Sequence, residues 1–162
     1  MTVREAVASD RDAIVQVFLD CWRESYVGVL PEAAIHAMTD ERAGAMWDRA
    51  LASEHGTILV ADQDNTVYGV TRFAAGSEGE PGAVYSLYVS PRARGLGLGT
   101  QLLDTAYNTL RAGGAQSVTL WVFAANAPSV AFYQGRGWVP DGETRTQDEF
   151  GEPELRLLRT DL

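Results

Sequence analysis

Residues 92–100 read Arg92-Ala93-Arg94-Gly95-Leu96-Gly97-Leu98-Gly99-Thr100, with three glycines at alternate positions. An apolar, aromatic run over 83–89 precedes this segment, and apolar residues at helical spacing follow it over 100–111. This order predicts a strand, a glycine-rich loop and a helix. Glycine allows backbone N–H groups to converge on one point, and a helix N-terminus adds positive potential. The segment therefore favours a phosphate-binding loop, and a flexible turn without a ligand is the alternative.

Two widespread phosphate-binding loops do not fit this spacing. The dinucleotide pattern GxGxxG needs its third glycine one residue later, and this loop lies in the middle of the chain. The triphosphate loop needs a lysine, and the chain of 162 residues contains none. A dinucleotide-binding protein stays an alternative hypothesis, which NAD(P) binding would support.

Charge is distributed unevenly along the chain. The sequence has 22 acidic residues and 13 basic residues, all of them arginine, for a net charge of −9. The absence of lysine excludes Schiff-base catalysis and a Ser–Lys nucleophile pair. The half 1–81 has 6 arginines and 14 acidic residues, whereas the segment 92–136 has 4 arginines and one acidic residue. The basic segment indicates an anionic small ligand, and no nucleic acid partner is expected.

The numbers of cysteines and histidines, and the length of the uncharged segment, limit where the protein is expected in the cell and which kinds of site it can have. Cys21 is the only cysteine and cannot form an internal disulfide, and the first residues resemble no signal peptide, so a cytoplasmic protein is predicted. Residues 112–135 carry no charge and are long enough for a membrane span, but Pro128 would break a helix there. They predict a buried strand followed by a separate helix, with no membrane partner. His36 and His55 fit no metal-binding pattern, so no metal site is predicted.

The whole chain, 1–162, predicts one domain of mixed α and β structure. Ser9 and Asp12 resemble a capping box at the start of the first helix. The expected helices cover 10–26, 31–53, 100–111 and 128–135, and the expected strands cover 3–7, 57–61, 67–75, 83–89, 118–123 and 155–159, with one more starting at residue 138.

Several motifs together resemble the GCN5-related N-acetyltransferase (GNAT) family. The spacing Arg94-x-x-Gly97-x-Gly99 is similar to the pyrophosphate-binding motif of that family. A second cofactor motif of the family has an Asn, a Phe-Tyr pair and a Gly-aromatic ending, and it is similar to Asn126-Ala127-Pro128-Ser129-Val130-Ala131-Phe132-Tyr133-Gln134-Gly135-Arg136-Gly137-Trp138. The segment 87–91 looks like the strand that leads into the loop, and 22–31 looks like the first helix and loop of a common bacterial subgroup. The resemblance covers most of the chain and is silent about the acceptor.

This resemblance implies a GNAT-like α/β fold. The central sheet would be mixed and mostly antiparallel, with about seven strands, and would splay between the fourth strand, 83–89, and the fifth, 118–123. About four helices would flank it. The implied cofactor is acetyl-CoA, with its pantetheine arm in the gap and its pyrophosphate on the amides of 95–100. The implied cofactor-binding residues are Leu87, Tyr88, Val89, Arg92, Arg94, Gly95, Leu96, Gly97, Leu98, Gly99, Thr100, Asn126 and Tyr133.

The implied activity is transfer of an acetyl group from acetyl-CoA to a primary amine, by direct attack through a tetrahedral intermediate. Tyr133 resembles the family's general acid, which protonates the leaving CoA thiolate; a core aromatic residue is the alternative. The acceptor would be a small-molecule amine or the amine of a peptide or protein. The resemblance also implies a possible homodimer.

The general base and the acceptor pocket are less constrained by the resemblance. Many relatives have a Glu near the start of the fourth strand, where this chain has Ala83. Glu24 is the base we expect, with Glu32, Tyr85 or a chain of water molecules as alternatives, and a solvated helix face is the other interpretation of both carboxylates. The acceptor-binding residues would be Trp22, Tyr26 and Tyr85, although Trp22 also suits core packing. The missing Glu motivates a second hypothesis, a non-catalytic acyl-CoA-binding regulatory module.

Overall fold

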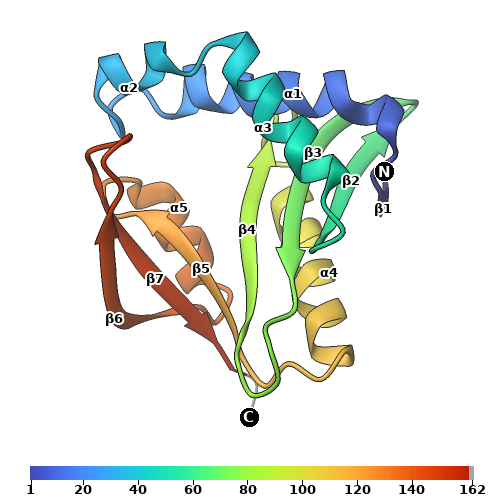
Figure 1. The fold of residues 1–162 in the computed structure, drawn as a ribbon, viewed down its shortest axis with the longest axis vertical. Helices are drawn as coiled ribbons and strands as arrows, with labels where there is room; N and C mark the ends of the chain where they lie inside the picture. The colour runs from blue at the N-terminus through green and yellow to red at the C-terminus, as the bar shows by residue number, and fades with distance from the viewer. Residues whose placement is uncertain (161–162) are drawn as a thin grey trace.

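The computed structural model describes residues 1–160, which form a seven-stranded mixed sheet in the order β1-β2-β3-β4-β5-β7-β6 (Figure 1). Every neighbouring pair is antiparallel except β4 and β5, which are parallel. The strands are β1 (Thr2–Glu5), β2 (Thr57–Gln63), β3 (Thr66–Ala74), β4 (Gly82–Val89), β5 (Val118–Phe123), β6 (Val139–Thr146) and β7 (Pro153–Arg159). The expected sheet of about seven strands is confirmed.

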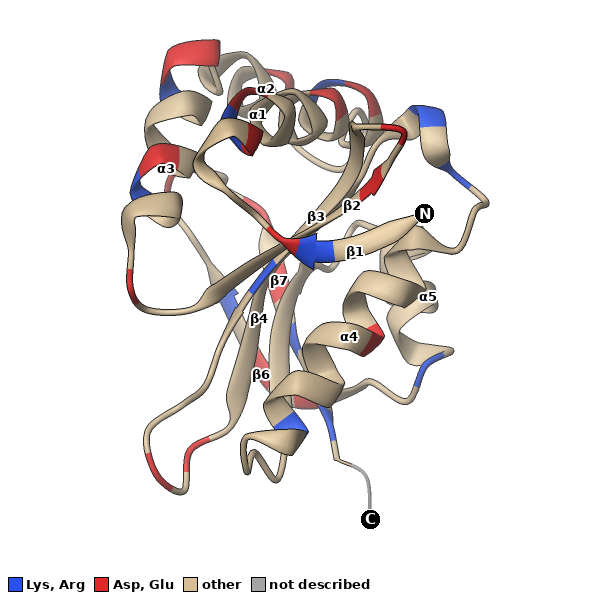
Figure 2. Ribbon diagram, turned by 90° about the vertical axis from the view of Figure 1, so that its right-hand side faces the viewer, with Lys and Arg blue, Asp and Glu red and all other residues tan. Residues whose placement is uncertain are grey.

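Helices lie on both faces of this sheet, as Figures 1 and 2 show. The α-helices are α1 (Arg11–Asp20), α2 (Glu32–Ala37), α3 (Asp40–Ala52), α4 (Leu98–Ala112) and α5 (Ala127–Gln134). Alternation along β2 separates two apolar cores: Leu59 and Ala61 belong to the core beneath α4, and Val60 belongs to the core beneath α1 and α3. The chain thus forms three layers, with the sheet in the middle.

The sheet splays where the sequence motifs place the split. Parallel pairing between β4 and β5 is limited to three residue pairs, Gly82 with Val118, Ala83 with Thr119 and Val84 with Leu120. The β3 ladder continues along β4 to Val89, and the β7 ladder continues along β5 to Phe123. Past Val84 the two strands therefore diverge, which opens a gap inside the sheet.

Two local expectations need correction. The helix expected over 31–53 is two helices, α2 and α3, because Met38 and Thr39 leave the helical conformation and the Thr39 hydroxyl accepts a hydrogen bond from the Arg42 N–H at 3.1 Å. A Thr N-cap starts a new helix at that point. The helix expected over 10–26 also changes after α1 into a π-helical turn, Cys21–Ser25.

The start of the first helix differs from the expected capping box. Asp10 is the N-cap of α1 and its side chain makes no hydrogen bond to that helix; its carboxylate accepts one from the Val7 N–H, ahead of the helix, at 2.8 Å. Arg4 donates two hydrogen bonds to the same carboxylate and holds the pKa of Asp10 below its usual value. These hydrogen bonds hold Asp10 against Arg4 of β1 and Val7, in the turn that precedes α1.

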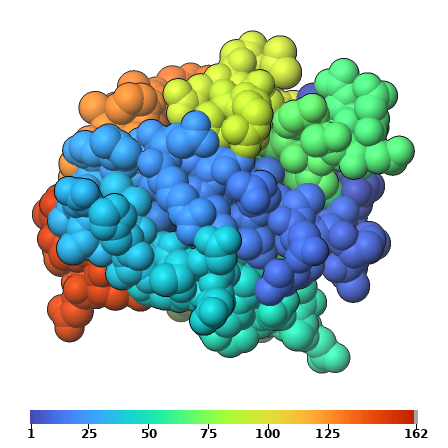
Figure 3. All heavy atoms as spheres, turned by 90° about the horizontal axis from the view of Figure 1, so that it is seen from above, coloured from blue at the N-terminus to red at the C-terminus, as the bar shows by residue number. Residues whose placement is uncertain are grey.

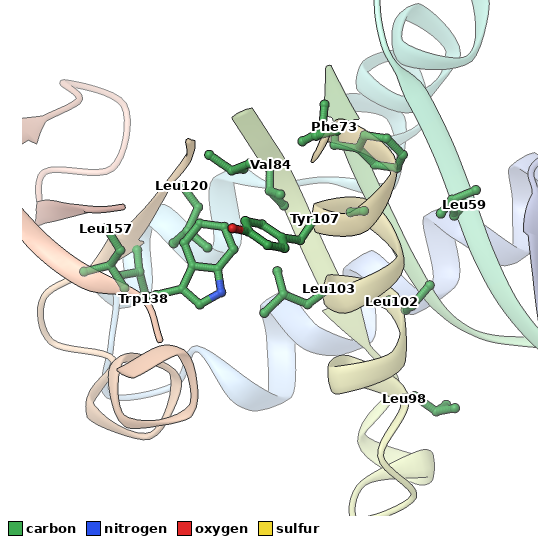
Figure 4. Close-up of a cluster of buried hydrophobic side chains, with 14 of the residues drawn as sticks. Leu59, Phe73, Val84, Leu98, Leu102, Leu103, Tyr107, Leu120, Trp138 and Leu157 are labelled. Atoms are coloured by element: carbon green, nitrogen blue, oxygen red, sulfur yellow. The ribbon is translucent and has the colours of Figure 1, made fainter. Parts of the chain in front are cut away.

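Trp138 is the largest side chain in the core beneath α4 and is fully buried (Figure 4). Its ring lies 6.0 Å from the ring of Tyr107 on α4 and 6.4 Å from that of Tyr133 on α5. The aromatic residue that ends the second cofactor motif therefore packs α5 against α4 and the sheet.

The charged residues are distributed unevenly in the folded structure as well as along the sequence. Acidic residues gather on α1, α2 and α3 (Figure 2). Seen from above, these helices cover the upper face, and the glycine-rich segment, coloured yellow-green, lies along their border (Figure 3). Within residues 1–160, no helix is both long and apolar enough to cross a bilayer.

Candidate active site

The glycine-rich segment forms a tight loop at the start of α4. Gly95 and Gly97 have φ values of +80° and +76°, a left-handed conformation that side chains other than glycine rarely adopt. Gly97 is the N-cap of α4, and a Cβ at either glycine would have no protein atom within 4 Å. A ligand can therefore approach the backbone at these two glycines without meeting a side chain, and the first N–H groups of α4 have no partner within the helix, as an anion-binding helix N-terminus requires.

A cavity of about 640 Å³ lies beside this loop; we call it the glycine-loop cavity. Its charged lining residues, among residues 1–160, are Arg94 and Arg136, with no carboxylate. The full lining is Cys21, Ser25, Tyr26, Leu87, Tyr88, Val89, Ala93, Arg94, Gly95, Gly97, Leu98, Gly99, Thr100, Asn126, Pro128, Ser129, Phe132, Tyr133 and Arg136. A surface with two cations and open amides is suited to a phosphate-containing ligand.

The structure places most of the expected cofactor residues around this cavity, with two exceptions. Leu96 is 64% exposed at the tip of the loop and does not line the cavity. Arg92 is also absent from the lining, because its guanidinium pairs with Asp20 and lies 4.0 Å from Glu24. Arg94 does line the cavity and donates a hydrogen bond to the Ser25 hydroxyl at 2.6 Å.

Arg136 is a cavity residue that the sequence motifs did not single out. Its Nε donates to the Thr100 hydroxyl at 2.8 Å, and its guanidinium lies 4.5 Å from the ring centroid of Phe132. These contacts fix the cation at the N-terminal turn of α4. The available signal was its membership of the basic segment 92–136, together with the glycines on either side of it.

A second cavity, of about 300 Å³, lies on the other side of the gap and is bordered by the β6–β7 hairpin; we call it the hairpin-side cavity. Trp121 and Phe123 line it from β5, and Arg145 and Glu154 line it from the hairpin. The residues that line both cavities are Tyr26, Leu87, Tyr88, Asn126, Ser129 and Tyr133. The two cavities therefore adjoin at the gap between β4 and β5.

Three tyrosines lie at this junction. Burial raises the pKa of Tyr133 to about 12, and it also raises the pKa values of Tyr26 and Tyr88. A raised pKa keeps each phenol protonated at neutral pH. Asn126 also borders both cavities, and its side-chain oxygen accepts a hydrogen bond from the Ser129 N–H at 3.3 Å, which caps α5 and positions Tyr133.

Cys21 borders the glycine-loop cavity as a neutral thiol. Its Sγ donates to the Val89 carbonyl oxygen at 3.0 Å, and burial raises its pKa to about 12. A thiol in that state is a poor nucleophile. This agrees with the sequence interpretation of Cys21 as a small buried residue.

The candidate bases are dispersed. Glu24 is exposed beside Arg92 and lines neither cavity in the described chain. Glu32 borders a separate hollow beside α2 and lies 3.7 Å from His36. Tyr85 does line the hairpin-side cavity, is 52% exposed, and has its hydroxyl 3.4 Å from His55 Nε2.

The expected acceptor residues Trp22, Tyr26 and Tyr85 all line the hairpin-side cavity. Trp22 is also buried in the core beneath α1, which agrees with core packing, and its role in acceptor binding stays a prediction. Ala83, which the resemblance puts in the place of a Glu base, lies in the same cavity. Sequence reasoning missed Glu154, because the segment around it reads as an acidic loop or hairpin arm.

The mixed sheet split between two parallel strands, with the N-terminus of α4 beside the split, agrees with the fold that the resemblance to an acyl-CoA-dependent acyltransferase family implies. The model of the acetyltransferase (GNAT) family matches residues 12–138, and the chain belongs to this family. It is 29% identical over its whole length to the uncharacterized N-acetyltransferase YuaI of Bacillus subtilis (strain 168), of which it covers 91%. It is 30% identical to the IAA acetyltransferase of Azospirillum brasilense, over 82% of this chain and 80% of that protein.

Solved structures agree with the fold. The crystal structure of the PaiA N-acetyltransferase from Thermoplasma acidophilum, in complex with coenzyme A, superposes with a TM-score of 0.80 over 99% of this chain and 98% of that chain. The sequences are 18% identical, so this likeness supports the architecture and leaves the site residues to be argued from the geometry above.

Proposed function

We propose that the protein transfers an acetyl group from acetyl-CoA to a primary amine. One observation carries the proposal: Tyr133, a half-buried phenol with a raised pKa, borders two cavities that adjoin at the gap in the sheet. Such a position lets one proton donor reach a reaction between two ligands that enter from opposite sides.

The residues around the glycine-loop cavity fit acetyl-CoA, the cofactor of the family. Coenzyme A carries a diphosphate and a further phosphate, and the cavity offers the open amides of 95–100 with Arg94 and Arg136. Strand β4 past Val84 has lost its β5 partner, so backbone groups near Leu87 and Val89 are available on that side for an amide-rich arm. A bound acetyl-CoA would supply the activated thioester.

Tyr133 would act as the general acid. The amine would attack the thioester carbonyl directly through a tetrahedral intermediate, and the departing sulfur would need a proton. A phenol with a raised pKa holds that proton at neutral pH and can donate it to a thiolate within hydrogen-bond reach.

For the proton that the acceptor loses, Tyr85 is better placed than Glu24. Tyr85 lines the hairpin-side cavity, while Glu24 lies outside both cavities beside Arg92. The Tyr85 hydroxyl lies 3.4 Å from His55 Nε2, and a ring nitrogen of histidine can accept a hydrogen bond. We therefore propose proton loss through Tyr85 or bound water, with Glu24 as a surface candidate.

Calorimetric binding of acetyl-CoA and mass detection of acetylated products across a panel of primary amines test the proposal together. We expect both binding and turnover. Binding without turnover on any amine would favour the regulatory module, and binding of NAD(P) in place of acetyl-CoA would favour the dinucleotide hypothesis.

Location and assembly stay predictions. A cytoplasmic protein and a homodimer are expected, and the acceptor amine is carried by a small molecule, a peptide or a protein. Native mass spectrometry of the purified chain measures the assembly directly.

The Arg136→Gln variant should weaken acetyl-CoA binding about 10-fold, the effect expected for losing charge-assisted hydrogen bonds to phosphate. The side chain lines the glycine-loop cavity and is fixed by Thr100 and Phe132. Calorimetry measures the Kd. The exposed Arg49→Gln variant, on α3, is the matched control, and equal affinities for the two variants would remove Arg136 from the cofactor site.

We expect kcat not to fall at alkaline pH, because the proposed general acid keeps its proton there. An unperturbed tyrosine would lose its proton around pH 10, but burial raises the pKa of Tyr133 to about 12, so the active phenol persists. We expect kcat to hold or rise between about pH 9 and pH 10.5, measured at saturating substrates with circular dichroism at each pH to confirm folding. A fall of kcat with an apparent pKa near 10 would show that Tyr133 titrates normally or is not the acid.

A further inference from the structure

The hairpin-side cavity has an unusual composition for an acceptor site in so acidic a protein. Of its lining residues, Arg145 and Glu154 are the charged ones within residues 1–160. Aromatic rings form much of the remaining wall, namely Trp22, Tyr26, Tyr85, Tyr88, Trp121, Phe123, Tyr133 and Phe150. The acidic residues that would attract a polycation lie instead on α1 to α3 (Figure 2).

Glu154 is the buried carboxylate of this cavity, with 5% of its surface exposed. Its Oε2 accepts hydrogen bonds from Arg145 Nε at 2.7 Å and from Gln147 Nε2 at 2.9 Å. Its Oε1 has only a long contact, 3.5 Å from Arg145 Nη2, within the described chain. A carboxylate accepts about four hydrogen bonds, so Oε1 has capacity left for a donor that enters the cavity.

The partners of Glu154 hold it in place. Arg145 and Glu154 are direct cross-strand neighbours on β6 and β7, and the Arg145 guanidinium lies 4.3 Å from the ring centroid of Trp121. The cation is thus fixed between a carboxylate and an aromatic face. This arrangement leaves Oε1 as the less satisfied atom of the pair.

The carboxylate also lies close to the junction of the two cavities. Glu154 is the cross-strand partner of Phe123 on β5, the Phe123 ring lies 5.9 Å from that of Tyr26, and Tyr26 borders both cavities. An amine bound to Oε1 would therefore be near the place where the proposed chemistry occurs.

We infer that Glu154 binds the amino group of the acceptor, and that this acceptor is a small primary amine carried on a flat apolar group. The inference rests on the proposed function. An amino nitrogen donates a hydrogen bond to Oε1, and the aromatic wall contacts the apolar remainder. A cavity of about 300 Å³ with aromatic walls suits a compact amine better than an extended peptide or a polyamine.

A purely structural role for Glu154 is the competing explanation. In that case the ion pair would only tie β6 to β7, and its loss would lower stability without changing the response to different amines. The experiment must therefore compare amines as well as variants.

Steady-state kinetics with phenethylamine, ethylamine, phenylalanine and spermidine make this comparison. Compared with phenethylamine, ethylamine lacks the ring, phenylalanine adds a carboxylate, and spermidine replaces the ring with additional positive charges. For the wild-type protein we expect kcat/KM to be highest for phenethylamine, at least about 10-fold above ethylamine, as apolar contacts of this size give. A preference for spermidine or phenylalanine would overturn the substrate class, and so would acetylation of none of the four by a protein that binds acetyl-CoA.

The Glu154→Gln variant should raise the KM for phenethylamine about 10- to 100-fold and leave the Kd for acetyl-CoA unchanged. Glu154→Asp keeps the charge but shortens the side chain, so its KM for phenethylamine should lie between those of the wild-type protein and Glu154→Gln. Glu143→Gln, an exposed carboxylate on the same hairpin, is the matched control. An unchanged KM in Glu154→Gln would overturn the residue assignment. If the wild-type protein does not bind acetyl-CoA, the proposed function itself fails. The Glu154 variants test only the binding of the acceptor, so the two failures can be told apart.

Discussion

The Tyr133→Phe variant should lower kcat about 100- to 1,000-fold and leave the affinity for acetyl-CoA unchanged. The substitution removes one hydroxyl at the junction of the two cavities and keeps the ring that packs against Trp138. Without the phenolic proton, the thiolate would leave unprotonated or would depend on water. Steady-state kinetics with a responsive amine and calorimetry with acetyl-CoA measure the two quantities separately.

Tyr68→Phe is the matched control for this loss. Tyr68 is partly buried beside the core under α4, and lines neither cavity within residues 1–160. It should retain the wild-type kcat. A Tyr133→Phe protein with full activity would disprove the acid assignment, and one that loses acetyl-CoA binding along with its rate would indicate a structural role.

The Trp138→Ala variant should lower the free energy of unfolding by about 3–5 kcal/mol. The indole is fully buried among Tyr107, Leu103 and Leu120 (Figure 4), and truncation leaves a large cavity that the sheet and α4 cannot readily close. Urea unfolding, monitored by far-ultraviolet circular dichroism so that the signal does not depend on tryptophan, gives the free energy of unfolding. A loss under about 1 kcal/mol would mean that the site collapses around the smaller side chain.

Trp138→Phe provides the comparison for this prediction. The indole N–H has no hydrogen-bond partner in the described residues, so its removal breaks no hydrogen bond. The phenyl ring restores most of the apolar contact, and the stability loss should be clearly smaller than that of Trp138→Ala. A difference of this kind would assign the stability to packing.

The sequence alone predicted the architecture well because its main signals are local. Alternating glycines, a preceding apolar run and a following helical period all lie within 83–111, and they specify the strand, loop and helix that the structure shows. The position of the split in the sheet came from the family resemblance and is confirmed. The helix expected over 31–53 was wrong because a single Thr N-cap interrupts a continuous helical pattern.

The site was harder to predict, because charges find their partners across the fold. Arg92 stands next to the glycines in sequence, yet Asp20 of α1 pairs with it. Arg136 is distant in sequence and lies at the loop. Glu154 could not be distinguished from its acidic neighbours until the hairpin placed it inside a cavity. The roles of Tyr133, Glu24 and the other expected site residues stay predictions.

The short pairing between β4 and β5 has a consequence for how the molecule behaves as a whole. Only three residue pairs join the ladder of β1–β4 to that of β5–β7 within the described sheet. A ligand lying in the gap would act as a surrogate strand and would satisfy backbone groups that the protein leaves open. The two half-sheets would then be mechanically coupled in the loaded protein and looser in the empty one, so that occupancy by a metabolite would set the rigidity of the fold.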